Sequence, residues 1–186
     1  MSIKIGIVGI IAATTMCSCS PGLSNDYTIY LSPQLSPEMT DEALTGLHEW
    51  EDKIPDLRLN IVFGYGEACD HCVLVQPESV DWLRSYSSHC AHDNCVGYTE
   101  WNAETDSYVV YLGTLDDSHT QQRRDMIAHE FGHSFGLRHP DAESPSQPDT
   151  AGVQIMCPGA CSTNHVTCAD AQQYYTIRGK VQPICE

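Results

Sequence analysis

The spacing of apolar side chains predicts a mixture of short strands and helices along the chain. Alternating or β-branched runs are typical of strands, and they occupy residues 27–32, 57–63, 72–75, 96–101 and 107–112. After the first run, Ser36, Pro37 and Glu38 supply a cap, a first-turn proline and an early acid. Apolar residues then recur at helical spacing as far as Asp52. A helix is therefore expected between the first two strands.

Further helices are expected after the third strand. We expect a helical turn over 78–85, a long helix from about Gln121 to Gly136, a loop over 139–155, and a final helix over 167–178 closed by Gly179. No internal repeat is present. The order of elements predicts a single α+β domain over residues 20–186, which is an ordinary length for one domain.

Residues 1–19 have the organisation of a signal peptide. Lys4 precedes an apolar run over 5–13, which is too short to remain as a membrane-spanning helix. The following Thr-Met-Cys-Ser-Cys is similar to the lipobox of bacterial lipoproteins, and either Cys17 or Cys19 can be the modified residue. Cleavage before Cys19 follows a small residue and leaves an even number of other cysteines. We expect an exported protein, either secreted or attached to the cell envelope through a lipid on Cys19.

Composition narrows the class of function. The formal charge of −16 argues against nucleic-acid binding and against electrostatic binding to an anionic bilayer. The 41% of hydrophobic residues excludes a disordered acidic tail. Ten cysteines disfavour a reducing compartment, so we expect disulfides rather than a zinc ribbon. The ribbon alternative would use the cysteines at 69, 72, 90 and 95, and the local disulfide candidates are 90–95, 157–161 and 168–185.

The segment HEFGHSFGLRH, at 129–139, carries the chemistry. On a helix, His129 and His133 differ by about 40° around the axis and about 6 Å along it, so both imidazoles can bind one cation. Glu130 is rotated by about 100° and suits a base acting on metal-bound water. If the helix continued, His139 would lie on another face and could not bind the same ion. Gly136 can end the helix in a left-handed conformation and turn the chain back toward the other two histidines.

This segment resembles the zinc signature HExxHxxGxxH of the metzincin metalloendopeptidases, and most closely that of the matrixin-type branch. Met156, 17 residues beyond His139, is similar to the methionine of the family's Met-turn. The resemblance implies a metzincin-like zincin domain with a twisted mixed β-sheet, an active-site helix and a small C-terminal lobe. It also implies that an extended peptide binds against an edge strand, for which the runs at 96–101 and 107–112 are candidates.

Some positions depart from the matrixin pattern. Pro140 follows the third histidine, where matrixins usually have serine, and no matrixin-type cysteine-switch propeptide is present. No tyrosine stands two residues after Met156, so the additional tyrosine ligand of serralysins and astacins has no counterpart there. These departures affect the subfamily and leave the metal chemistry intact.

The sequence thus predicts an exported zinc-dependent endopeptidase. His129, His133 and His139 would bind one Zn²⁺, and Glu130 would act as general base on metal-activated water. One alternative is a non-catalytic surface lipoprotein with a structural zinc site, which a fourth protein ligand would close. Another is a protease of the same chemistry that cleaves peptidoglycan crosslinks. Calcium is a second candidate cation because of acidic clusters at 41–42, 49–52 and 116–117, although no ligand-spaced loop is visible.

Overall fold

The computed structural model describes residues 25–66, 72–86, 97–114, 120–139, 155–156 and 165–181. Its elements, in order, are β1 (Asp26–Leu31), α1 (Pro37–Lys53), β2 (Arg58–Phe63), β3 (Cys72–Glu78), α2 (Val80–Tyr86), β4 (Gly97–Asn102), β5 (Ser107–Gly113), α3 (Thr120–Ser134) and α4 (Cys168–Ile177). The leader predicted over 1–19 and nearly all of the loop predicted over 139–155 lie outside the described residues.

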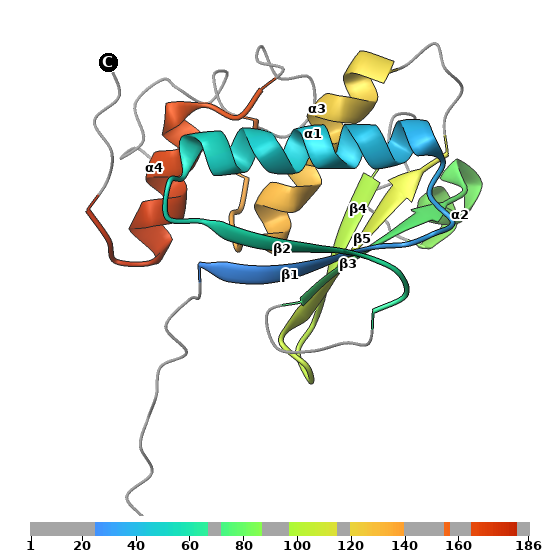
Figure 1. The fold of residues 1–186 in the computed structure, drawn as a ribbon, viewed down its shortest axis with the longest axis horizontal. Helices are drawn as coiled ribbons and strands as arrows, with labels where there is room; N and C mark the ends of the chain where they lie inside the picture. Colours follow the sequence, from blue (N-terminus) through green and yellow to red (C-terminus); the bar gives the residue numbers. More distant parts are fainter. Residues whose placement is uncertain are drawn as a thin grey trace, which may run out of the picture.

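The strands form one five-stranded mixed sheet in the order β2-β1-β3-β5-β4. The pairs β1–β2, β1–β3 and β3–β5 are parallel, whereas β4 runs antiparallel to β5. Figure 1 shows α1 and α3 lying over the same face of this sheet. The predicted mixed α+β architecture is therefore confirmed. Of the two strands expected beside the peptide, β5 lies inside the sheet, so only β4, at its edge, can pair with an added strand.

Helix α1 begins where the sequence predicts and packs closely on α3. The Ser36 hydroxyl accepts a hydrogen bond from the backbone N–H of Met39 at 3.2 Å, and Pro37 follows in the first turn. At Gly46 the two helices approach so closely that a Cβ would lie 3.2 Å from the backbone nitrogen of Ala128. The buried indole N–H of Trp50 donates to the carbonyl of Ala128 at 2.8 Å, which fixes α1 against the segment that carries the histidines.

The core lies between the sheet and these helices. Strands contribute inward residues such as Ile29, Val73 and Val110, and α1 contributes Leu47 and Trp50, all fully buried. The helix α3 and the turn after it supply three further core residues, each at most 2% exposed: Phe131, Phe135 and Leu137. The histidine segment is therefore fixed by apolar packing from its opposite side.

Two predicted boundaries differ from the structure around residue 77. Strand β3 continues past the predicted end at Val75 to Glu78, since Pro77 and Glu78 still align with Leu112 and Gly113 of β5. A proline near the end of a strand removes only one donor, which this pairing tolerates. Helix α2 starts at Val80, later than predicted, because the Ser79 hydroxyl caps it by accepting from the N–H of Trp82 at 3.1 Å.

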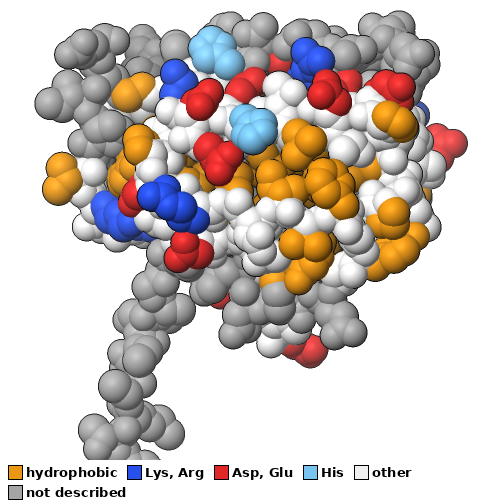
Figure 2. All heavy atoms as spheres, in the orientation of Figure 1, with side chains coloured by type: hydrophobic (Ala, Val, Ile, Leu, Met, Phe, Trp, Pro, Cys, Tyr) orange, Lys and Arg blue, Asp and Glu red, His pale blue; other side chains and the backbone are white. Residues whose placement is uncertain are grey.

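Apolar side chains reach the surface at the edge of the sheet opposite β4. Figure 2 shows hydrophobic side chains gathering over α1 and β2. Leu44 of α1 and Leu59 and Ile61 of β2 are half-buried against the core, while Phe63 and Tyr65 are 67% and 73% exposed. Because β2 and β4 are the two edges of the sheet, this patch is separated from β4 by three strands.

Two further observations concern the cysteines and the membrane. Cys72 at the start of β3 and Cys168 at the start of α4 are each disulfide-bonded. The remaining cysteines, including the candidate pairs 90–95 and 157–161, lie outside the described residues.

Within the described ranges, every helix is too short or too polar to cross a bilayer.

Candidate metal centre

Helix α3 and the turn that ends it bring three histidines together. His129 and His133 lie one turn apart on α3. Gly136 has a φ of +86°, its N–H donates to the carbonyl of His133 at 2.9 Å, and the N–H of Leu137 donates to the carbonyl of Gly132 at 3.0 Å. This pair of bonds is a Schellman motif, which needs a residue in the left-handed region and favours glycine there. The chain consequently turns back, and His139 returns to the two helical histidines.

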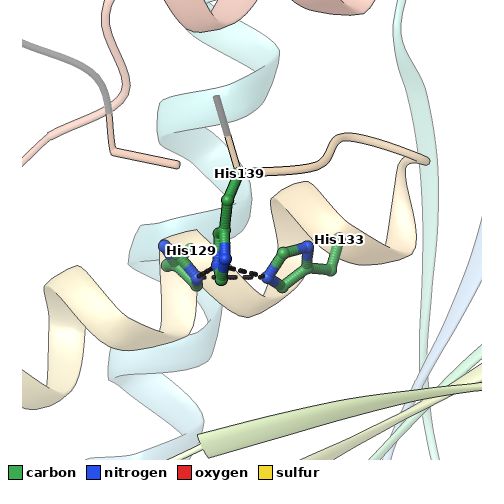
Figure 3. A group of neighbouring side chains, drawn as sticks. All are labelled: His129, His133 and His139. Carbon is green, nitrogen blue, oxygen red and sulfur yellow. Dashed lines mark hydrogen bonds between the residues drawn. The ribbon is translucent and has the colours of Figure 1, made fainter. Parts of the chain in front are cut away.

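The three imidazoles converge on one point. The Nε2 atoms of His129 and His139 are 3.0 Å apart, those of His129 and His133 are 3.1 Å apart, and those of His133 and His139 are 3.2 Å apart. Figure 3 shows the rings meeting at these nitrogens, with two rings from α3 and the third from the segment that follows it. The bend at Gly136 therefore has the consequence predicted from the sequence.

The other ring nitrogens show that the converging atoms carry lone pairs. Nδ1–H of His129 donates to the carbonyl of Ile155 at 2.7 Å, and Nδ1–H of His133 donates to the carbonyl of Leu137 at 3.0 Å. A carbonyl only accepts, so both Nδ1 atoms carry the proton and a neutral ring leaves Nε2 as an acceptor. Burial lowers the pKa of both side chains, which favours the neutral form. Two lone pairs that face each other at 3.1 Å repel, and a metal ion between them could bind both.

The donor set fits a small divalent metal ion. Three nitrogens bound to Zn²⁺ at about 2.0–2.1 Å with tetrahedral angles would stand about 3.3 Å apart. The observed separations are 3.0–3.2 Å. Among the described residues, the groups of His, Cys, Asp and Glu with metal-binding geometry comprise these three histidines alone. They can hold a metal ion, and backbone carbonyls orient two of them, as is usual for metal-binding imidazoles.

Glu130 follows His129 on α3, and its side chain contacts strand β4 of the sheet. Its side chain is buried, and its Oε2 accepts a hydrogen bond from the Thr99 hydroxyl of β4 at 2.7 Å. Burial raises the pKa of the carboxyl above its ordinary value, while the charge of a protonated His133 and the Thr99 hydrogen bond act in the opposite direction. Glu130 is close enough to His133 for their charges to interact, yet it is not part of the histidine group.

Met156 packs against α3 at Gly132. A Cβ on Gly132 would collide with the Met156 sulfur and would lie 2.9 Å from the Trp50 ring, so only glycine fits at that position. Met156 and Ile155 are buried. Met156 therefore lies against α3 at Gly132, where close packing holds it.

Asp170 connects α4 to this segment and was not identified from the sequence. Its buried carboxylate accepts from the N–H of Ile155 at 3.0 Å and from the N–H of Met156 at 3.2 Å, and it also accepts from the N–H and hydroxyl of Thr167, the N-cap of α4. The carbonyl of Ile155 in turn accepts from His129. Asp170 therefore fixes the peptide unit that orients the first histidine.

Replacing Asp170 with alanine is expected to weaken both the fold and the metal site. Two buried N–H groups would lose their acceptor, at about 1–3 kcal/mol each. The carbonyl of Ile155 would shift, and loss of a group that orients a ligand typically weakens metal binding about 10–100-fold. Urea denaturation and metal titration measure the two effects. Unchanged metal affinity in a destabilised but folded Asp170→Ala protein would contradict the link to His129.

The acidic clusters that were candidates for calcium binding are only partly within the described residues. The acidic pair at 116–117, one of the calcium candidates, is outside them. The pair at 41–42 is on α1, where Asp41 lies 3.8 Å from Arg124 and Glu42 is buried. Over the described ranges, the acidic residues form no group with metal-binding geometry.

Comparisons with known proteins return weak likenesses. No protein-family model and no curated protein matches the chain. Two solved structures of myroilysin are similar to it. One has a TM-score of 0.41 at 18% identity and covers 64% of this chain. The other has a TM-score of 0.38 at 14% identity and covers 87%. The matches span 50% and 65% of the myroilysin chains. With both TM-scores below 0.5, these likenesses carry no argument about function.

Proposed function

We propose that this protein is an exported zinc-dependent endopeptidase of the metzincin type. The observation that carries the proposal is the convergence of three Nε2 atoms within 3.2 Å of one another, two of them with their Nδ1–H groups donated to carbonyls. Such a set binds a metal through three protein ligands, which is the number that leaves catalytic zinc an open position. The matrixin-type pattern of the sequence motif supports zinc and peptide hydrolysis.

The residues divide the chemistry between them. His129, His133 and His139 would hold Zn²⁺. The ion would be a Lewis acid and would lower the pKa of a bound water to near neutrality. Glu130 takes a proton from the attacking water while the water oxygen bonds to the scissile carbonyl carbon. The same carboxyl then delivers that proton to the departing amine nitrogen as the C–N bond breaks. Burial of Glu130 keeps competing water away from this carboxyl.

The substrate would be an extended peptide alongside β4. That strand is the edge of the sheet, and its residues 97 and 99 contact the Glu130 side chain. An added strand would therefore lie beside both the carboxylate and the histidines. By the family resemblance, residues 157–166 would shape the pocket for the residue after the cleaved bond, and of these only 165 and 166 are among the described residues.

The test begins with the purified mature protein. We expect about one zinc per chain by mass spectrometry of the metal, and cleavage of casein that stops when a chelator removes the metal. Return of cleavage on adding zinc completes the test. A protein that binds one zinc with four protein ligands and cleaves neither casein nor cell-wall peptides is instead the non-catalytic lipoprotein. Cleavage of cell-wall peptides alone identifies a peptidoglycan peptidase.

Export and lipidation form a separate part of the proposal. Cells expressing the full chain should carry the protein outside the cytoplasm, and incorporation of labelled fatty acid should disappear in Cys19→Ser if that residue is acylated. Fatty-acid labelling that is absent from the unaltered chain identifies a secreted protein.

A further inference from the structure

Strand β4 turns two of its residues toward the α3 side of the sheet, at the level of Glu130. A Cβ on Gly97 would lie 2.8 Å from Cγ of Glu130, so the carboxylate side chain fits only because position 97 has no side chain. Two residues further along the same face, Thr99 reaches Glu130 directly. The alternate residues Tyr98 and Glu100 belong to the opposite face, where both lie near Tyr111.

The Thr99 hydroxyl makes a short contact with the carboxylate. Its Oγ1 lies 2.7 Å from Oε2 of Glu130 and 2.9 Å from the Glu130 backbone carbonyl. A threonine hydroxyl has one proton to donate, and an ionised carboxylate attracts it more strongly than a carbonyl that already belongs to a helix. Because Glu130 is only 5% exposed, water competes weakly for this hydrogen bond.

This contact distinguishes the two carboxylate oxygens. Oε2 is occupied by the Thr99 hydroxyl, and among the described residues Thr99 supplies the hydrogen bond that fixes the carboxylate. In the proposed reaction, Oε1 would then be the oxygen that gains the proton from water and later gives it up. Gly97 leaves room for the Glu130 side chain, and the Thr99 hydroxyl binds one of its oxygens. Both residues belong to β4, so this edge strand determines the orientation of the carboxylate.

We propose that Thr99 is a positioning residue for Glu130, which it holds with Oε2 bound and Oε1 directed to the reaction. This inference rests on the proposed function, since it assigns the proton transfer to Glu130. It also implies that β4, against which the peptide would bind, is the strand that positions the Glu130 side chain. A displacement of β4 would then misplace the carboxylate as well as the substrate.

The test compares Thr99→Val with Thr99→Ser. Valine keeps the shape and suits a strand but has no hydroxyl, whereas serine keeps the hydroxyl. For Thr99→Val we expect kcat to fall about 10–100-fold, with KM and zinc content nearly unchanged, as for other groups that orient a reacting residue. Thr99→Ser should restore most of kcat. The matched control is Thr28→Val on β1, which should leave kcat at the wild-type value.

One double variant tests whether Thr99 acts through Glu130. If Thr99 acts through Glu130, adding Thr99→Val to Glu130→Gln should cost little further activity, because the two residues act as a unit. A full additional loss would overturn the positioning role, as would equal kcat in Thr99→Val and wild type. A similar loss in Thr99→Ser and Thr99→Val would assign the effect to packing and overturn it too.

A measurement on the metal-free protein separates this inference from the proposed function. A double-mutant cycle on urea unfolding, with Thr99→Val and Glu130→Ala, should show non-additive changes if the hydroxyl binds the carboxylate, because alanine removes the acceptor that glutamine would keep. This result needs no catalysis. An inactive wild type with a coupled cycle would contradict the peptidase while retaining the contact. An additive cycle would overturn the contact even in an active peptidase.

Discussion

Glu130→Gln is expected to abolish nearly all peptide hydrolysis while leaving the metal bound. Glutamine preserves the size of the side chain and can still accept from the Thr99 hydroxyl through its carbonyl oxygen, but it cannot take a proton from water. Positioned general bases contribute about 10²–10⁴-fold to rate, so kcat should fall by about that factor. The three imidazoles are untouched, and zinc content should remain near one per chain. Initial rates on a fluorogenic peptide, with metal analysis of the same sample, measure both.

The matched control for this variant is Glu104→Gln. Glu104 is exposed in the turn between β4 and β5, so the same change of charge there should leave kcat unaltered. An active Glu130→Gln enzyme would remove Glu130 from its assigned role. A loss of zinc from Glu130→Gln would show instead that the carboxylate supports the metal site rather than the proton transfer.

His139→Ala is expected to weaken zinc binding, and activity should fall because zinc is lost. His139 is exposed, and it follows the Schellman turn rather than belonging to α3, so its removal should leave the fold intact. Loss of groups that merely orient a ligand weakens binding about 10–100-fold, and loss of a ligand itself should exceed about 100-fold. Zinc titration against a competing chelator measures the affinity, and thermal unfolding of the metal-free protein verifies the fold.

A second histidine provides the comparison. His48 lies on α1 with its side chain 63% exposed, beside Glu51. His48→Ala should bind zinc as tightly as the unaltered protein. Equal zinc affinity for His139→Ala and His48→Ala would mean that the ring at 139 is not a ligand.

The convergence of the three histidines could be predicted from the sequence because its geometry is local. His129 and His133 are related by one helical turn, and the return of His139 needs only one residue in the left-handed region, which Gly136 supplies at a φ of +86°. The helix α1 was equally predictable, since its cap, its proline and its apolar spacing lie in consecutive residues. Local rules of this kind need no knowledge of the tertiary fold.

Thr99 and Asp170 could not be found in the same way. The contact of Thr99 with Glu130 joins residues 31 positions apart and depends on which strand occupies the edge of the sheet. Asp170 had one local signal, the capping box with Thr167, which predicts a helix start but not its bonds to Ile155 and Met156. Strand order was likewise open, since alternation along a strand does not say which neighbours it pairs with.

The measurement that tests the central claim most directly is X-ray absorption at the zinc edge on the purified protein, supported by metal analysis. We predict one zinc per chain with three imidazole nitrogens and one water oxygen at about 2.0–2.1 Å. Removal of His139 should reduce the imidazole contribution. A protein that retains no zinc after purification and zinc reconstitution would contradict the account, as would a zinc whose fourth ligand comes from the chain itself.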